Sequence, residues 1–471
     1  MSFPARAHAP ARPRALIDRI IDPRYRRNFL VFLGDYYLFI TAISFAAPST
    51  VLPSLVRALT PSTPLIGLVE TIRTGVWLVP QMFVAWFLAG RVVRRRHVIA
   101  PVLVGRIAFL CLVPVVLFLP GVKGTLALSL FFLCLAIFYA GDGSGTLAWL
   151  ELFSATVPAE GRARLVGIVQ TLSGITGIGA GAFVAWTLGS GRIAFPGNFA
   201  VLLAAAGFFM ILEVVVLSFL KPPADAKVHP SPARSFSARL ASILRTDPQF
   251  RLFVLVRLLA GAGSMAAPFY MVFALDVLGL GSGSIGVFTA AQVIGGILSA
   301  PLMARMGERR GTRAVIRLST VLVLCVPLAG LGVFALHPLI GGVAALSLYA
   351  VLFVLLGSAG NGSTAGFMNY LLEFSPAQER PAYVGMANTL NGLVFVAPLL
   401  GGWIVAASSY PMLFAVTAAI SLAAVFGARK LKEPRVPDAL FRLPPPAFSC
   451  VPGGPAGSRR SGACTRRGTR P

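Results

Sequence analysis

Acidic residues are scarce in this sequence. Its 471 residues include 16 Asp and Glu against 41 Lys and Arg, and charged residues make up only 12% of the chain, while hydrophobic residues make up 56%. The surface of a soluble protein has to be polar, and so few charges cannot cover a soluble chain of this length. The composition excludes an ordinary soluble protein and indicates one that lies mostly within a membrane.

Cysteine and histidine are also few, with five and four residues. Cys111, Cys134 and Cys325 lie in apolar stretches, whereas Cys450 and Cys464 lie near the C-terminus. This pattern offers neither a disulfide framework nor a metal-ligand spacing. The sequence contains no Gly-x-x-x-x-Gly-Lys-Ser/Thr phosphate loop, no His cluster, no paired catalytic carboxylates and no Ser-His-Asp arrangement. We therefore expect no cofactor, no bound metal and no enzymatic activity.

Apolar stretches of about 20 residues recur along the chain, and a helix of this length crosses the bilayer core. We predict twelve, six in each half, near 29–55, 65–89, 98–119, 125–149, 165–187, 198–220, 251–276, 284–304, 314–336, 341–368, 383–406 and 410–428. The chain then divides into a basic N-terminal tail (1–27), a first six-helix half (28–220), a central linker (221–250), a second six-helix half (251–430) and a basic tail rich in Pro and Gly (431–471). We expect this last tail to be disordered because it has few large apolar residues.

The two halves repeat one another. Phe45-Ala46-Ala47-Pro48 in the first returns as Met265-Ala266-Ala267-Pro268 in the second. Val166-Gly167 is likewise echoed by Val384-Gly385. A duplicated set of apolar helices is typical of a two-halved membrane transporter.

Basic residues fall on one side of the predicted topology. They occupy the N-terminal tail, the loops at 91–96 and 305–317, the central linker and the end of the chain, whereas the opposite side has only Arg57, Lys123 and Arg192. By the positive-inside rule, both termini and the linker are expected to be cytoplasmic, with the protein in the cytoplasmic (inner) membrane. Nucleic-acid binding would need a polar folded module that carries the charge, and none is visible.

The basic loop after the second span of each half resembles a loop motif of the major facilitator superfamily, Gly-x-x-x-Asp-Arg-x-Gly-Arg-Arg. The second copy matches better, with Glu308 at the acid position, whereas Gly90 takes that position in the first copy. The resemblance, which extends to the six-plus-six spans and the central loop, implies an all-α membrane fold with two pseudo-symmetric halves. It also implies a cytoplasmic gate, in which the acid interacts with the start of a neighbouring helix. The residues of this motif are Gly90, Arg91 and Arg94 in the first half and Glu308, Arg309, Gly311 and Arg313 in the second.

In that family the first, fourth, seventh and tenth spans line a central cavity. Polar residues form stripes at helical spacing on these four spans. They are Tyr37, Thr41 and Ser44 on the first, Tyr139, Asp142 and Thr146 on the fourth, Arg257 and Ser264 on the seventh, and Ser358 and Asn361 on the tenth. We predict that Asp142 and Arg257 face one another across the cavity and serve substrate binding or coupling, because an intramembrane ion is costly without a function. A cytoplasmic latch between the halves, with no part in binding, is the alternative.

Other charges within the spans are expected to have different roles. Asp35 points away from the stripe and is predicted to pair within its own half with Arg106, as a structural pair or as a proton relay. Glu70 and Arg73 are three residues apart and meet on one helix face. With Gln292 of the second half they suggest an outer vestibule; surface pairing of little consequence is the alternative.

The predicted function is a secondary active transporter that moves a small molecule by alternating access. Proton-coupled efflux of an amphiphilic or weakly basic compound is the preferred form, and uptake of a small polar solute is the alternative. A second class, in which the fold is kept without solute transport, as in a lipid scramblase, a sensor or an assembly factor, stays open. The expected partners are a small-molecule substrate, the lipid bilayer and protons, in a monomer without nucleic acid.

Overall fold

The computed structural model describes residues 25–88, 91–118, 124–221, 242–376 and 379–434. Within these ranges every element is helical, and eleven segments are long and apolar enough to cross a membrane. Helices suit such a sequence because all their backbone groups bond within one segment, as lipid requires. The predicted all-α membrane fold is confirmed. The tails at 1–24 and 435–471, most of the central linker, and Gly90 and Lys123 lie outside the described residues.

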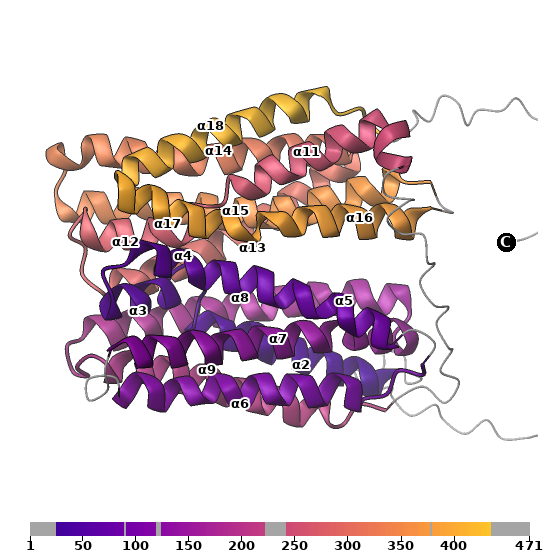
Figure 1. The fold of residues 1–471 in the computed structure, drawn as a ribbon, viewed down its shortest axis with the longest axis horizontal. Helices are drawn as coiled ribbons and strands as arrows, with labels where there is room; N and C mark the ends of the chain where they lie inside the picture. Colours follow the sequence, from indigo (N-terminus) through magenta and orange to yellow (C-terminus); the bar gives the residue numbers. More distant parts are fainter. Residues whose placement is uncertain (1–24, 89–90, 119–123, 222–241, 377–378, 435–471) are drawn as a thin grey trace, which may run out of the picture. The chain divides into compact units, whose positions relative to one another are not determined.

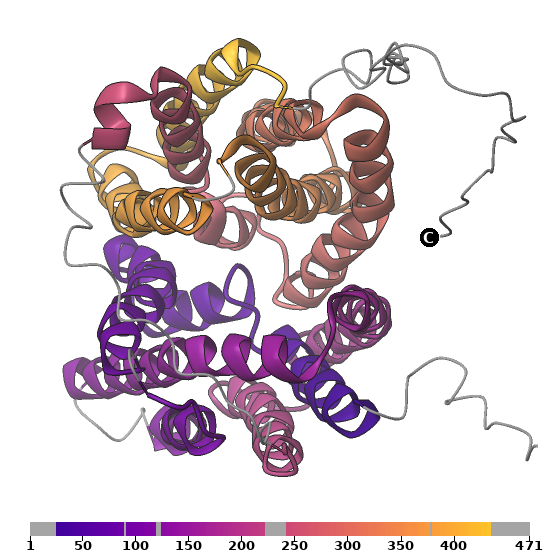
Figure 2. The same cartoon turned by 90° about the vertical axis from the view of Figure 1, so that its right-hand side faces the viewer.

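The helices form two bundles, one from each half of the sequence (Figures 1 and 2). The first bundle contains α2 (Arg26–Phe45), α3 (Val51–Leu59), α4 (Thr63–Thr71), η1 (Ile72–Val76), α5 (Trp77–Leu88), α6 (Arg96–Phe118), α7 (Gly124–Thr156), α8 (Ala159–Gly189) and α9 (Gly197–Leu217). The second contains α11 (Pro248–Ala262), α12 (Ala267–Asp276), α13 (Ser284–Arg310), α14 (Thr312–Leu336), η3 (His337–Leu339), α15 (Gly342–Phe374), α16 (Arg380–Gly392), η4 (Leu393–Val396), α17 (Ala397–Ala407) and α18 (Tyr410–Lys430).

The predicted second span contains a π-helical turn. The chain is helical without a break from Thr63 to Leu88, as α4, then the π-helical η1, then α5. Pro80 lies one turn into α5, and because it has no N–H, the carbonyl of Val76 loses its usual helical donor where η1 ends. The eleven membrane-length segments counted above do not include this interrupted helix, and it supplies the remaining one of the twelve predicted spans.

The first and seventh spans, predicted as single helices, are each interrupted at the repeated motif. In the first half α2 ends at Phe45 and α3 starts at Val51, with Pro48 between them. In the second half α11 ends at Ala262, and Pro268 lies in the first turn of α12, where its missing N–H costs nothing. Each half therefore carries one discontinuous helix at the same place.

The two halves meet closely at one end of the bundles, where α3, α4 and α12 lie together (Figure 1). Glycines allow this approach: a Cβ on Gly67 of α4 would overlap the Pro398 carbonyl at the start of α17, and a Cβ on Gly286 of α13 would overlap the Gly181 carbonyl of α8. An ion pair also joins the halves, with 2.9 Å from Arg57 Nε to Asp276 Oδ2. Arg57 and Asp276 follow helices that start at the end of the bundles where α2 begins and α18 ends, so the halves close at the opposite end.

Candidate functional site

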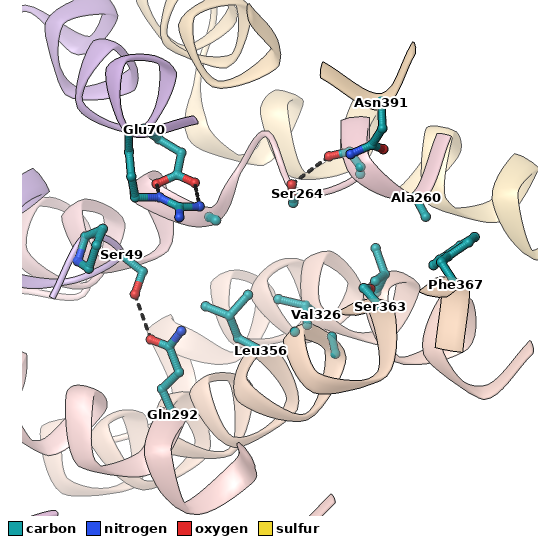
Figure 3. A pocket seen from close by; sticks show the side chains of 18 of the residues that line it. Ser49, Glu70, Ala260, Ser264, Gln292, Val326, Leu356, Ser363, Phe367 and Asn391 are labelled. Carbon is teal, nitrogen blue, oxygen red and sulfur yellow. Dashed lines mark hydrogen bonds and ion pairs between the residues drawn. The ribbon is translucent and has the colours of Figure 1, made fainter. Parts of the chain in front are cut away.

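A cavity of about 680 Å³ lies beside the breaks in both discontinuous helices. Pro48 and Ser49 reach it from the break after α2, and Ser264 and Ala267 reach it from the break before α12. Most of the remaining lining comes from α11, α14 and α15 of the second half, and it is largely apolar (Figure 3). The repeated motif, first noticed as a sign of duplication, thus borders the cavity in both halves.

Polar groups from the first half line one part of this cavity. Arg73 Nε donates to Glu70 Oε2 at 2.7 Å, so the predicted pair on one helix face is present. Ser49 Oγ donates to Gln292 Oε1 of α13 at 2.7 Å, and this hydrogen bond connects the two halves (Figure 3). Glu70, Arg73 and Gln292, predicted together as an outer vestibule, therefore line one cavity.

Arg257 brings a positive charge to the same cavity. Its Nη2 donates to Asn388 Oδ1 of α16 at 3.0 Å. Its Nη1 is buried and makes no hydrogen bond among the described residues. The charged residues in the described lining are Glu70, Arg73 and Arg257. Since Glu70 and Arg73 neutralise one another, the lining has a net positive charge at Arg257.

Asp142 lies elsewhere, in a buried cluster of charges within the first half. Arg106 Nη2 donates to Asp142 Oδ1 at 2.8 Å and to Glu213 Oε1 at 2.9 Å, and Arg106 Nε donates to Glu213 Oε2 at 3.1 Å. Trp77 Nε1 donates to the other Asp142 oxygen at 3.0 Å. The structure thus pairs Asp142 with Arg106 and not with Arg257, which corrects the predicted geometry. The cause is the close packing of α6 against α7, where a Cβ on Gly105 would come within 2.9 Å of the Phe138 carbonyl.

Asp35 lies near this cluster without a direct bond to Arg106. Trp149 Nε1 donates to Asp35 Oδ2 at 2.6 Å, and the Asp35 side chain is buried. The predicted Asp35–Arg106 pair is therefore replaced by an Asp35–Trp149 hydrogen bond and an Arg106–Glu213 ion pair. Glu213 was missed as a site residue, although the need of an intramembrane carboxylate for a cation could have pointed to it.

Comparison with known proteins identifies the fold. The sequence model of the Major Facilitator Superfamily matches residues 269–448. This match lies in the second half of the chain.

Three solved structures share the fold, each at a sequence identity that shows the fold alone. A bacterial metal transporter is 14% identical, with a TM-score of 0.60, over 87% of this chain and 99% of that one. A bacterial homologue of the iron transporter ferroportin, in the inward-facing state, is 13% identical, with a TM-score of 0.64, over 86% and 98%. The nucleoside transporter NupG, as a variant, is 12% identical, with a TM-score of 0.66, over 86% and 99%. No curated protein matches the sequence.

Several residues on the predicted stripes bond to neighbouring helices. Asn361 Nδ2 donates to the Gly296 carbonyl at 2.5 Å and Ser358 Oγ donates to the Gly295 carbonyl at 3.0 Å, so both face α13. The remaining stripe residues, apart from Arg257 and Ser264, are also absent from the described lining of the cavity; they are Tyr37, Thr41, Ser44, Tyr139, Asp142 and Thr146. Thr41 Oγ1 lies 3.2 Å from Thr176 Oγ1 of α8. Polar side chains here join helices to one another, as is common in membranes.

Basic residues in or beside the two predicted loop motifs contact the end of the last helix in each half. Arg95 Nη1 donates to the Ser218 carbonyl after α9 at 2.9 Å, and Arg317 Nη2 donates to the Arg429 carbonyl of α18 at 2.6 Å. Arg313 Nη1 lies 3.4 Å from the Leu431 carbonyl. The last carbonyls of a helix have no partner within it, so these cations stabilise both helix ends. In the first copy, the Arg91 guanidinium lies over the Phe87 ring, 4.1 Å from its centroid. Arg94, Glu308 and Arg309 lie at the ends of the same two loops, and their gating role stays a prediction.

Replacing Gly311 by Ala is expected to destabilise the protein by about 1–2 kcal/mol. Gly311 has a φ of 83°, a conformation that L side chains rarely adopt, and the Glu433 carboxylate occupies the space that a Cβ would need. The measurement is thermal unfolding of both proteins in detergent. Gly332→Ala on α14 is the control, because a Cβ there meets nothing within 4 Å, and an equal loss in both variants would contradict the explanation.

Proposed function

We propose that this protein is a secondary active transporter that moves a small molecule across the cytoplasmic membrane by alternating access. The observation that carries the proposal is the cavity itself, which borders the break in the discontinuous helix of each half. Discontinuous helices at the interface of repeated halves are where transporters of this kind bind their solutes. The match of residues 269–448 to the Major Facilitator Superfamily model supports the same function.

The closed end favours a cavity that opens to the cytoplasm. The Arg57–Asp276 ion pair, the hydrogen bond from Thr63 to the Gly402 carbonyl and the hydrogen bond from Ser282 to the Leu188 carbonyl all join the halves at the end opposite the termini. With cytoplasmic termini, this arrangement is inward-facing. Transport then requires these contacts to separate while the cytoplasmic ends approach one another.

The buried cluster in the first half is the proposed coupling site. Asp35, Asp142 and Glu213 share a single neighbouring guanidinium, that of Arg106. Because uncompensated charge within a membrane is costly, a proton on one of the three acids lowers the charge of the cluster. We propose that this proton drives efflux, since the largely apolar lining suits an amphiphilic solute.

Proteoliposome flux across a panel of small molecules, with and without an imposed pH gradient, tests the proposal. Asp142→Asn is expected to reduce gradient-driven flux at least about tenfold while solute exchange without a gradient persists. Loss of one proton-binding carboxylate removes the coupling of flux to the pH gradient but leaves solute binding intact. Glu160→Gln, an exposed carboxylate in the first turn of α8, is the matched control. Stable insertion without gradient-dependent flux of any compound would overturn the proposal and favour a superfamily member that does not transport solutes.

A further inference from the structure

The charge of the cavity points to the class of its ligand. We propose that the cavity binds an organic anion, with a carboxylate or phosphate group on Arg257 and an apolar body against the surrounding lining. The inference deepens the proposed function, because it names the substrate class of the same cavity. It replaces the weakly basic compound that the sequence favoured.

Arg257 has an unused donor in a place where a donor is costly to leave unpaired. Its Nη2 is held by Asn388, which fixes the guanidinium, while Nη1 is buried and has no acceptor among the described residues. An unsatisfied buried donor on a charged group carries a large desolvation cost. A guanidinium with an unused donor suits an oxyanion, because it can give two parallel hydrogen bonds to two oxygens of a carboxylate or phosphate.

No acid in the described lining is left to neutralise Arg257. The carboxylate of Glu70 accepts both of its bonds from Arg73, and Asp142 is held in the first half by Arg106 and Trp77. The C-terminal end of α11 and the N-terminal end of α12 both reach the cavity, so their helix dipoles offset one another. The positive charge of Arg257 therefore makes the cavity favour a negatively charged ligand.

The rest of the lining suits a ligand with an apolar part. Val326, Leu356 and Phe367 supply aliphatic and aromatic surface, and Ser363 and Asn391 supply a few uncharged polar groups (Figure 3). Val323 adds to the aliphatic surface. A mainly apolar pocket with a few placed polar groups is the usual form of a small-molecule site. A small inorganic anion would leave this apolar surface unused, which is why we infer an organic one.

Four compounds that share a benzene ring and differ in the charge of their polar group test the proposal. Benzoate, phenyl phosphate, neutral benzamide and cationic benzylamine are bound to the purified full chain in lipid nanodiscs, with affinity measured by equilibrium dialysis and no gradient imposed. At least one of the two anions is expected to bind about tenfold more tightly than benzamide, since a charge-assisted hydrogen bond contributes this much. The two anions distinguish carboxylate from phosphate recognition.

Three variants assign the effect to one side chain. In Arg257→Gln the ratio of anion affinity to benzamide affinity is expected to fall to about one. In Arg257→Lys part of the preference for the anion is expected to remain because the charge is kept. Arg192→Gln, which removes the same charge from an exposed loop, is expected to bind like the wild type. Thermal unfolding establishes that each variant is folded.

Equal or weaker binding of both anions relative to benzamide in the wild type would overturn the inference, as would tightest binding of benzylamine. Persistence of the full anion preference in Arg257→Gln would overturn it too. A chain that binds benzoate as expected but moves no solute in proteoliposomes would instead refute the proposed transport and leave the anion site standing. The two failures are therefore distinguishable.

Discussion

Arg106→Gln is expected to lower the free energy of unfolding by at least about 3–5 kcal/mol, because it leaves buried carboxylates without their cation. The Arg106 side chain is 1% exposed and gives three hydrogen bonds to Asp142 and Glu213. It also lies over the rings of Phe39 and Phe138, which adds two cation–π contacts that Gln cannot make. The measurement is thermal or denaturant unfolding in detergent, together with the amount of protein inserted in the membrane.

A double variant separates lost charge balance from lost packing. Arg106→Gln combined with Glu213→Gln is expected to recover part of the stability, since two neutral amides replace an ion pair that was costly to desolvate. Arg192→Gln on the exposed loop is the matched control and is expected to change stability by less than about 0.5 kcal/mol. Wild-type stability of Arg106→Gln would show that the cluster does not hold the first half together.

Gly67→Ala is expected to reduce transport at least about tenfold by preventing the two halves from closing on the side opposite the termini. A Cβ at Gly67 would overlap the carbonyl of Pro398, which is backbone and cannot rotate away. The displacement of α4 from α17 shifts the population away from the arrangement seen here. Flux in proteoliposomes, with any solute that the wild type moves, is the measurement.

Labelling of the cavity shows whether conformation is the cause. In a chain without native cysteines, Ser49→Cys places a thiol in the lining of the cavity, and a membrane-impermeant maleimide reports its access from outside. Labelling from outside is expected to rise with Gly67→Ala and to stay low with Gly179→Ala, because a Cβ at Gly179 meets nothing within 4 Å. Unchanged labelling with Gly67→Ala would contradict this reading of the closed end.

The membrane fold and the duplication follow from the sequence because they depend on composition and on local patterns. Span length, the asymmetry of basic residues and the repeated Ala-Ala-Pro motif can each be recognised without knowing which helices contact one another. The breaks at Pro48 and Pro268 were not predicted, because Pro is tolerated inside membrane helices that continue. The π-helical turn before Pro80 could not be predicted for the same reason.

The partners of the intramembrane charges depend on contacts between helices that the sequence does not describe. Alignment of the repeats found the cavity face of the seventh span, with Arg257 and Ser264, and it found Glu70 with Arg73 because these are neighbours on one helix. It failed for Asp142, whose partner was set by the close contact of α6 and α7. A stripe of residues at helical spacing shows which way the side chains point around one helix. The formation of an ion pair depends in addition on the distance between two helices.

The polar contacts that close the end where α3, α4 and α12 meet are few, and this has a thermodynamic consequence. The polar contacts comprise an ion pair in which Arg57 is 36% exposed and a few hydrogen bonds of about 0.5–1.5 kcal/mol each, beside a buried apolar cluster that α3, α4 and α12 share. Two conformations separated by only a few kcal/mol are both populated, and a ligand that prefers one by tenfold moves the balance by about 1.4 kcal/mol. Since separation of the halves at this end breaks only a few polar bonds, occupancy of one solute site is enough to shift the balance between the two conformations.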